Sequence, residues 1–181
     1  SEYRGDYGKT REELADFHRE RIHILAEAGP DVFACETIPC LFEALAETDV
    51  LSEIPGAEAW ISFSCKDGLH TCGGDLISDC AKALKDIKEV AAIGINCTAP
   101  QYVESLIKEI VKVTDKPVVV YPNSGEDYDA GSKSWEGSAA KYEEYVKIWY
   151  EAGARLIGGC CRTGPEDIRK VAAFRKSLIE K

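Results

Sequence analysis

Five short apolar runs, each followed by a longer stretch of mixed apolar and polar residues, divide the chain at similar intervals. The runs begin near residues 31, 58, 90, 117 and 154. They are rich in Val, Ile and Ala without strict polar alternation, which is typical of strands covered on both faces in a parallel sheet. The stretches between them have the spacing of amphipathic helices, so the pattern predicts five successive strand–helix units.

Capping and turn residues set the expected bounds of these elements. Thr10 and Glu13 form a capping-box pattern that opens a helix, and Gly29-Pro30 ends it. Four positions of this helix are expected to be buried: Leu14, Phe17, Leu25 and Ala28. The sequence predicts strands over 31–35, 58–64, 89–96, 117–121 and 155–158, and helices over 10–28, 40–52, 76–88, 100–113, 138–152 and from Pro165 onward.

Two architectures contain units of this kind: a doubly wound open sheet and an eight-fold β/α barrel of the TIM type. A barrel needs about 250 residues, whereas this chain has 181 and opens with a helix that no strand precedes. We therefore interpret residues 1–181 as one α/β domain, the C-terminal part of a parallel β/α barrel. It comprises about five strand–helix units preceded by one helix.

Charge and cysteine content narrow the class of protein. The net charge of -10 disfavours binding to nucleic acid and to anionic lipid. No apolar run approaches the roughly 20 residues of a membrane span, and we expect no signal peptide. Eight cysteines within an α/β pattern indicate reduced thiols in a cytoplasmic protein rather than a secreted disulfide framework.

Three of the cysteines follow the ends of two predicted strands. Cys97 closes the segment Gly94-Ile95-Asn96-Cys97, and Cys160 and Cys161 lie in Gly158-Gly159-Cys160-Cys161-Arg162. Parallel sheets carry their chemistry at the carboxyl ends of strands, and three thiolates with one open position suit a catalytic zinc ion. The alternative is that all three are small buried apolar residues, as free cysteines often are.

Other polar residues after strands have two readings each. Glu36 should reach the same edge of the sheet as the thiols, or it is a solvated acid before a helix. Asn96 either holds a zinc ligand in place or is an ordinary turn residue. Asn123 and Ser124 lie in the long loop after the fourth strand, where they contact a substrate or form a plain turn.

Several remaining residues are assigned no chemistry. Trp135 either shields the site or anchors a loop by packing, and Arg162 either offsets the thiolates or pairs with an acid. The other cysteines are expected to be structural, and no histidine is assigned to a metal. The cysteines expected to be structural are Cys35, Cys40, Cys65, Cys72 and Cys80, and the three histidines are His18, His23 and His70.

The two cysteine segments resemble the signature motifs of the zinc-dependent homocysteine S-methyltransferase family. The segment from Phe33 to Pro39 resembles a third block of that family. Tyr121-Pro122-Asn123-Ser124-Gly125-Glu126, with Tyr128, Asp129 and Trp135 after it, is similar to the branch that uses S-methylmethionine or S-adenosylmethionine. The segment from Ser1 to Tyr7 resembles that branch at a point some way into the full-length protein.

The resemblance implies a β/α barrel in which Cys97, Cys160 and Cys161 are the catalytic and zinc-binding residues. A methyl group would move from a sulfonium donor to the zinc-bound thiolate of homocysteine, giving methionine. Glu36 would bind the ammonium group of homocysteine, with Asn96, Asn123 and Ser124 as further substrate-binding candidates. A free thiol with a pKa near 8.5 is mostly protonated at pH 7, and zinc binding makes it a thiolate.

The chain departs from the family at its N-terminal side, where full-length relatives carry strands that complete the barrel. Without them the barrel cannot close, and two open strand edges remain. We expect such a chain to bind zinc yet to be weakly active or inactive, with self-association through the open edges. Other readings are a betaine- or folate-dependent methyltransferase, a zinc-binding fragment without catalysis, and a thiol redox protein on a doubly wound sheet.

Overall fold

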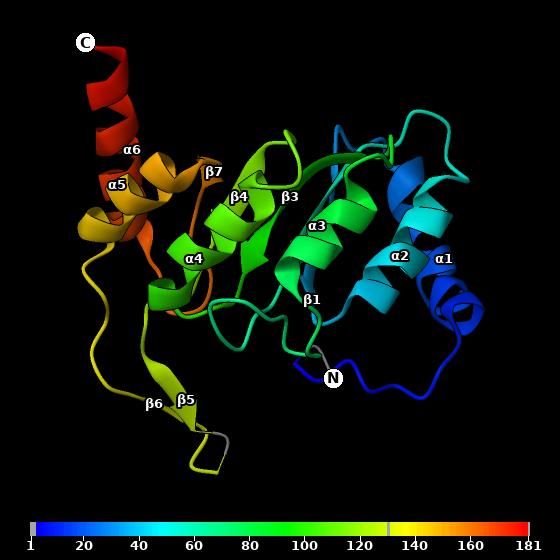
Figure 1. The fold of residues 1–181 in the computed structure, drawn as a ribbon, viewed down its shortest axis with the longest axis horizontal. Helices are drawn as coiled ribbons and strands as arrows, with labels where there is room; N and C mark the ends of the chain where they lie inside the picture. The colour runs from blue at the N-terminus through cyan, green and yellow to red at the C-terminus, as the bar shows by residue number, and fades with distance from the viewer. Residues whose placement is uncertain (1–2, 130, 181) are drawn as a thin grey trace.

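The computed structural model describes residues 3–129 and 131–180 of the chain, so Ser1 and Glu2 of the N-terminal segment lie outside the described residues. Figure 1 labels the elements along the chain. Their bounds are α1 (Arg11–Glu27), β1 (Phe33–Ile38), α2 (Leu41–Leu51), β2 (Ala59–Phe63), α3 (Ile77–Leu84), β3 (Val90–Asn96), α4 (Pro100–Val111), β4 (Val118–Tyr121), β5 (Asp127–Asp129), β6 (Ser134–Glu136), α5 (Tyr142–Ala152), β7 (Ala154–Ile157) and α6 (Pro165–Ile179).

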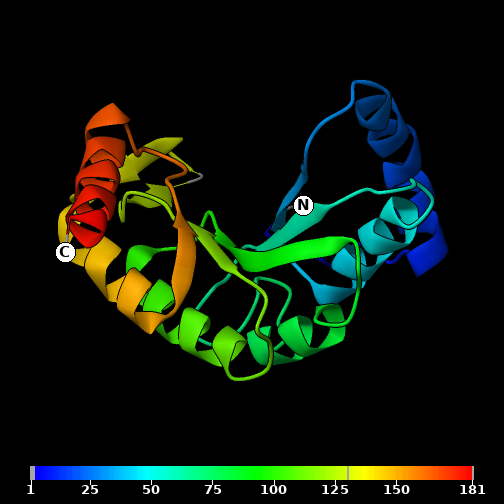
Figure 2. The same ribbon diagram turned by 90° about the horizontal axis from the view of Figure 1, so that it is seen from above.

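The main sheet has five parallel strands in the order β1-β2-β3-β4-β7, which is their order along the chain. A doubly wound sheet needs a reversal of strand order at its switch point, and this sheet has none. Figure 2 shows the strands curving along the inner side of an arc with the helices outside it. The prediction of a partial parallel β/α barrel is confirmed.

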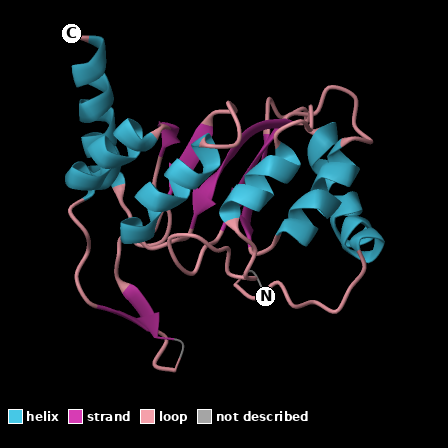
Figure 3. Ribbon diagram, in the orientation of Figure 1, coloured by secondary structure: helices cyan, strands magenta, loops and turns pink. Residues whose placement is uncertain are grey.

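The core lies between the outer face of the sheet and the helices, which cover that face (Figure 3). Ile61 pairs with Ile93 and Phe63 with Ile95 across β2 and β3, and all four side chains are fully buried. Because side chains alternate along a strand, the residues between them point to the concave face. The concave face of β2, β3 and β4 therefore carries Trp60, Ser62, Gly94, Asn96 and Tyr121.

The five predicted strands and six predicted helices are all present, with differences at their ends. The helix expected over 76–88 ends at Leu84. Strand β1 runs on to Ile38, so Glu36 lies within a strand and not after it, at an irregularity in the pairing between Cys35 and Ile38. The long loop after β4 contains an antiparallel hairpin, β5-β6, in which Trp135 pairs with Tyr128.

The predicted buried face of the first helix is largely wrong. Leu14 is buried as expected, but Phe17 and Leu25 are exposed by 65% and 49% of their surface, and Ala28 is also exposed. The helix instead buries Leu14, Ala15, His18 and Ile22. Helix α1 packs on α2. The side of α1 that faces α2 therefore includes a histidine and not the two apolar residues Phe17 and Leu25.

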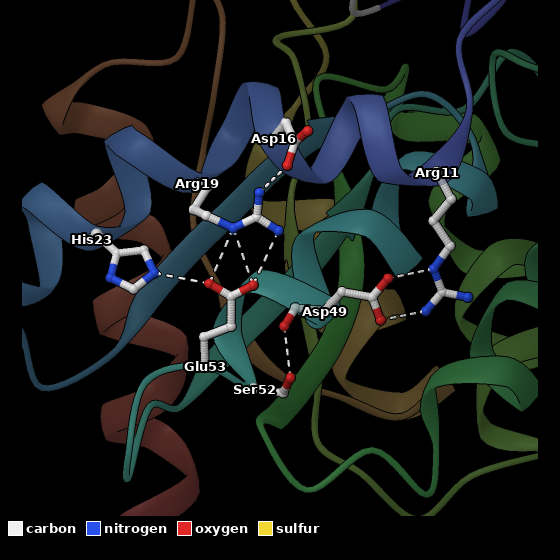
Figure 4. A network of polar contacts seen from close by, with 7 residues as sticks. All are labelled: Arg11, Asp16, Arg19, His23, Asp49, Ser52 and Glu53. Atoms are coloured by element: carbon white, nitrogen blue, oxygen red, sulfur yellow. Dashed lines mark hydrogen bonds and ion pairs between the residues drawn. The ribbon is translucent and has the colours of Figure 1, made fainter.

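Ion pairs at the surface reinforce the packing of α1 on α2, as Figure 4 shows. The guanidinium of Arg11 pairs with Asp49, and Arg19 and His23 both pair with the carboxylate of Glu53. These side chains are partly exposed, so each pair contributes little on its own. No helix among residues 3–129 and 131–180 is long and apolar enough to cross a membrane.

Candidate metal centre

The structure brings the three candidate thiols together. The Sγ atom of Cys97 lies 2.7 Å from that of Cys160 and 3.9 Å from that of Cys161, and the vicinal pair is 3.9 Å apart. Two loops separated by more than sixty residues of sequence therefore meet at the carboxyl ends of β3 and β7. All eight cysteines are free thiols, with these three only partly buried.

Backbone hydrogen bonds continue past the strand ends and hold both cysteine loops to the segment after β4. The N–H of Cys97 donates to the carbonyl of Tyr121 at 3.3 Å, and the N–H of Cys160 donates to that of Pro122 at 2.9 Å. The N–H of Ser124 in turn donates to the carbonyl of Cys161 at 3.0 Å. The segment after β4 is thus the brace that fixes the two loops relative to each other.

Two glycines allow the close backbone approach that this bracing needs. A Cβ atom on Gly94 would meet the carbonyl oxygen of Val119 at 1.8 Å, so β3 and β4 could not pair with a side chain there. A Cβ on Gly159 would lie 2.3 Å from Oγ1 of Thr163, whose hydroxyl donates to the carbonyl of Cys160. Both glycines of the sequence motifs therefore shape the cysteine loops.

The donor set fits a zinc ion. Tetrahedral ligation with zinc–sulfur bonds of about 2.3 Å would place the sulfur atoms about 3.8 Å apart. Both contacts of Cys161 have this length, whereas the edge between Cys97 and Cys160 is 2.7 Å and must open by about 1 Å around an ion. Three sulfur ligands select a soft or borderline metal such as zinc over magnesium or calcium.

The three neighbouring thiols shift one another's pKa values. The hydrogen bond from Cys160 lowers the pKa of Cys97 to about 6, against the opposing effect of burial. The same hydrogen bond raises the pKa of Cys160, and burial raises that of Cys161.

A hollow of about 350 Å³ on the concave face adjoins the cysteine loops. Its lining includes Glu36 from β1, Trp60 from β2 and Tyr121 from β4, together with Gly158 and Gly159. Burial raises the pKa of Tyr121, and the neighbouring Glu36 adds to the effect. A carboxylate beside two aromatic rings suits a cationic group of a small molecule.

The remaining sequence candidates occupy different environments. Asn96 is buried and lies among Thr37, Ser62 and Cys97 rather than in open solvent. The Oδ1 atom of Asn123 is one of three buried side-chain polar atoms in the described chain that have no hydrogen-bond partner. The hydroxyl of Ser124 donates to Glu126 at 2.8 Å, so that side chain is already engaged.

Arg162 and Trp135 also have definite places. The guanidinium of Arg162 lies 3.2 Å from the carboxylate of Glu126, and this arginine, at a φ of 65°, ends the cysteine loop. Trp135 lies in β6, within the hairpin after β4. Of the two readings offered for Arg162, pairing with an acid is the one that the contacts support.

Sequence reasoning missed three residues around the thiols. Thr37 and Tyr3 both hydrogen-bond to the sulfur of Cys97, and Ser62 bonds to Asn96 and Tyr121. Position 62 could have been found from the two-residue alternation of β2, because Trp60 and Ser62 are the polar members of an otherwise apolar run. Tyr3 comes from a loop whose path no periodicity reveals.

A second group with metal-ligand chemistry lies between α1 and α2. His18, Glu43 and Glu47 are all buried, and their ligand atoms lie within 4.8 Å of one another. The sequence analysis assigned no role to these residues. Its signal was present, since Glu43 and Glu47 are four residues apart and so share one helical face.

Comparison with known proteins places this architecture in a family. The family model described as homocysteine S-methyltransferase matches residues 1–174. The chain belongs to the homocysteine S-methyltransferase family. It is 54% identical over 180 residues to homocysteine S-methyltransferase YbgG of Bacillus subtilis (strain 168), covering 98% of this chain and 57% of that protein.

Other members of the family show the same partial coverage. Selenocysteine Se-methyltransferase of Brassica oleracea var. italica is 47% identical over 191 residues, which cover all of this chain and 54% of that protein. The crystal structure of the homocysteine methyltransferase MmuM from Escherichia coli in its metallated form has a TM-score of 0.83 at 39% identity, covering 96% of this chain and 55% of that one. The chain thus spans about half the length of the relatives it matches.

Proposed function

We propose that this chain carries the zinc site of a methyltransferase that moves a methyl group from a sulfonium donor to the thiol of homocysteine, giving methionine. The observation that carries the proposal is the meeting of Cys97, Cys160 and Cys161 at the ends of β3 and β7. Membership of the homocysteine S-methyltransferase family supports it. S-methylmethionine or S-adenosylmethionine is the proposed donor, from the resemblance of the segment after β4.

Methyl transfer between two sulfur atoms needs an ionised acceptor in line with the methyl carbon. Cys97, Cys160 and Cys161 would hold a zinc ion, which would favour ionisation of the substrate thiol, whose pKa near 8.5 otherwise leaves it mostly protonated. The bond from the donor sulfur to the methyl carbon breaks as the new carbon–sulfur bond forms. The electron pair stays on the departing sulfur, which becomes a neutral thioether, and the thiol proton goes to solvent.

The concave face supplies the groups that would orient the amino acid. Glu36, in the hollow beside Trp60 and Tyr121, is proposed to bind the ammonium group of homocysteine. Among the loop candidates, Asn123 has a buried oxygen without a partner in the described chain and is therefore a better substrate contact than Ser124, whose hydroxyl is taken by Glu126. Asn96 is proposed to act indirectly, by holding the loop that carries Cys97.

Metal content and methyl transfer, measured on the same preparation, test the proposal. We expect one zinc ion per chain and at most weak methyl transfer to homocysteine from one of the two sulfonium donors, with none from betaine or a folate. Cys72→Ser is a matched control, because Cys72 is a partly buried thiol outside the cluster. Metal-free protein, or zinc that survives Cys97→Ser, would rule out the site.

Zinc binding without methyl transfer is a second candidate function. Among residues 3–129 and 131–180, the outer strands β1 and β7 each pair on one side only, and Leu156 on β7 is 44% exposed. We propose that these edges bind further strands, from the rest of a longer protein or from a second copy of this chain. One zinc per chain with no turnover, together with a dimer in light scattering, would favour this candidate over the first.

We further propose that the residues printed here belong to one barrel domain and act in the cytoplasm. Every strand of the main sheet pairs with its sequence neighbour, so no boundary divides the sheet. Eight free thiols, three of them poised to bind metal, suit a reducing compartment. A single cooperative unfolding transition, and recovery of reduced thiols from a cytoplasmic fraction, are the corresponding tests.

A further inference from the structure

We propose that Thr37 is a positioning residue of the metal centre: its hydroxyl donates a hydrogen bond to the sulfur of Cys97, and Asn96 fixes the direction of that bond. This inference rests on the proposed function, because it concerns how the chain holds one of the metal ligands. Oγ1 of Thr37 lies 3.9 Å from Sγ of Cys97. The direction of the bond follows from the donors and acceptors around Asn96.

The amide of Asn96 has only one possible orientation. The backbone N–H of Thr37, which can only donate, points at one amide atom at 2.8 Å, so that atom is the oxygen. The hydroxyl of Ser62 donates to the same oxygen at 2.9 Å. The other amide atom is therefore the nitrogen, and it lies 2.7 Å from Oγ1 of Thr37.

That orientation leaves the proton of Thr37 for the sulfur. The amide nitrogen has protons and no lone pair to offer, so Oγ1 of Thr37 accepts from it. The hydroxyl proton of Thr37 must then point elsewhere, and Cys97 is the acceptor within reach. A sulfur that binds a metal is a thiolate and accepts hydrogen bonds without donating any.

The same direction extends back across the concave face. The indole N–H of Trp60 donates to the hydroxyl oxygen of Tyr121 at 3.0 Å, and that hydroxyl lies 2.5 Å from Oγ of Ser62. The hydroxyl of Ser62 donates its own proton to Asn96, so in the contact between Ser62 and Tyr121 the tyrosine is the donor. From Ser62 onward each bond points its proton toward the sulfur, and aligned bonds strengthen one another. The hydroxyl of Tyr121 also hydrogen-bonds to Glu36.

The backbone at both ends of the final bond is unusual. Thr37 has a φ of 63° and Cys97 a φ of 46°, both in the left-handed region that β-branched residues in particular avoid. Such a conformation persists only where the surroundings hold it, and it is a common feature of functional sites. The two contacts of Thr37 with Asn96 are the holding interactions, and they aim the hydroxyl at the cysteine loop.

Cobalt and zinc titrations of four variants test the assignment. Thr37→Val keeps the shape and removes the hydroxyl, Thr37→Ser restores the hydroxyl, and Thr48→Val makes the same chemical change at a buried position on α2. Zinc affinity is measured by competition with a chromogenic chelator, and the thiolate-to-cobalt charge-transfer band reports on the sulfur itself. Tyr3→Phe is the fourth variant, because Tyr3 also hydrogen-bonds to Cys97.

In Thr37→Val we expect zinc affinity to fall about tenfold and the charge-transfer band to move to longer wavelength, because the sulfur lone pairs lose a stabilising donor. Thr37→Ser and Thr48→Val should match the unmodified chain, and the band shift should persist in the Tyr3→Phe background. An unmoved band, or an equal loss in Thr37→Ser, overturns the hydrogen bond. If the unmodified chain binds neither metal, the proposed function itself fails and this inference falls with it.

Discussion

The chain contains two sets of metal-ligand side chains, and they differ in whether a basic side chain belongs to the set. The first set, Cys97, Cys160 and Cys161, comes from two distant loops at the carboxyl ends of β3 and β7 and is partly exposed. His18, Glu43 and Glu47 come from two adjacent helices and are buried. The first set consists of thiols alone, whereas the second contains a basic side chain, His18, that lies between two acids.

The histidine of the second set lies between two acids. Nε2 of His18 is 3.0 Å from Glu43 and Nδ1 is 3.5 Å from Glu47, so each ring nitrogen faces a separate carboxylate. The hydroxyl of Tyr7 donates to the other oxygen of Glu43 at 2.6 Å. A metal bound to one ring nitrogen would need both carboxylates beside that nitrogen, so the arrangement is better described as a buried cluster of one histidine and two acids. Of the two sets that could hold a metal, we therefore propose that the thiols bind one and that the second set serves packing.

The largest expected effect comes from removing one thiol of the first set. Cys97→Ser deletes one of three soft ligands, and the zinc association constant should fall by about 100-fold or more. Folding should be little affected, because Cys97 lies at the partly exposed edge and not in the core. Chelator competition measures the constant, and circular dichroism checks the fold. A chain that unfolds on losing this thiol would make the first set structural, like the second.

Removing the histidine of the second set should lower the stability of the fold and leave zinc binding unchanged. His18→Ala leaves Glu43 and Glu47 buried without their partner, which typically lowers the free energy of unfolding by about 3–5 kcal/mol. Urea titration measures the loss. The control is His23→Ala on the same helix, where the histidine pairs with Glu53 at the surface and a far smaller change is expected. Lost zinc in His18→Ala alone would erase the contrast between the two sets.

The pH dependence of the free energy of unfolding tests the protonation of the two acids in the second set. Burial raises the pKa of Glu47 to about 7, with His18 opposing the shift, whereas His18 and Tyr7 lower that of Glu43 in spite of its burial. Between about pH 4.5 and 7 the folded chain holds a proton on Glu47 that the unfolded chain has lost, so this residue makes stability fall as pH rises.

Glu47→Gln imitates the protonated acid and should remove that part of the slope. The free energy of unfolding of the variant, relative to that of the unmodified chain, should rise by on the order of 2 kcal/mol between pH 5 and pH 8. Paired urea titrations at several pH values measure the difference, in which the contributions of Glu43, Cys35 and Arg21 largely cancel. If the variant instead becomes less stable relative to the unmodified chain as pH rises, Glu47 is ionised and paired with His18.

The sequence predicted what depends on local pattern and failed where tertiary packing decides. The continuous apolar runs located all strands of the main sheet, and the glycine–cysteine segments located the thiols, because chemistry gathers at strand ends in such folds. The face of α1 was mistaken because Phe17 and Leu25 are apolar, yet the helix buries His18 toward α2. Only the position of Glu43 and Glu47 explains a buried histidine there, and periodicity does not reveal partners.

Around the thiols, the sequence named Asn96 but could not say what it does. Its role depends on Thr37, which is 59 residues away in the chain, and on Ser62 from the strand between them. The irregular pairing of β1 after Cys35 and the left-handed backbone of Thr37 bring these groups together. Such features leave no compositional signal, since Thr is an ordinary strand residue.

The smallest expected effect concerns Arg162, and it tests whether the first set truly lacks a cation of its own. The guanidinium is half exposed and pairs with Glu126, which also accepts from Ser124. An exposed pair of this kind contributes little, so Arg162→Ala should change zinc affinity by less than about threefold and leave the unfolding midpoint within error. Glu126→Gln, which breaks the same pair from the acidic side, is the matched control. If Arg162→Ala weakens zinc binding strongly while Glu126→Gln does not, the arginine interacts with the thiolates directly, and the two sets differ less than their contacts indicate.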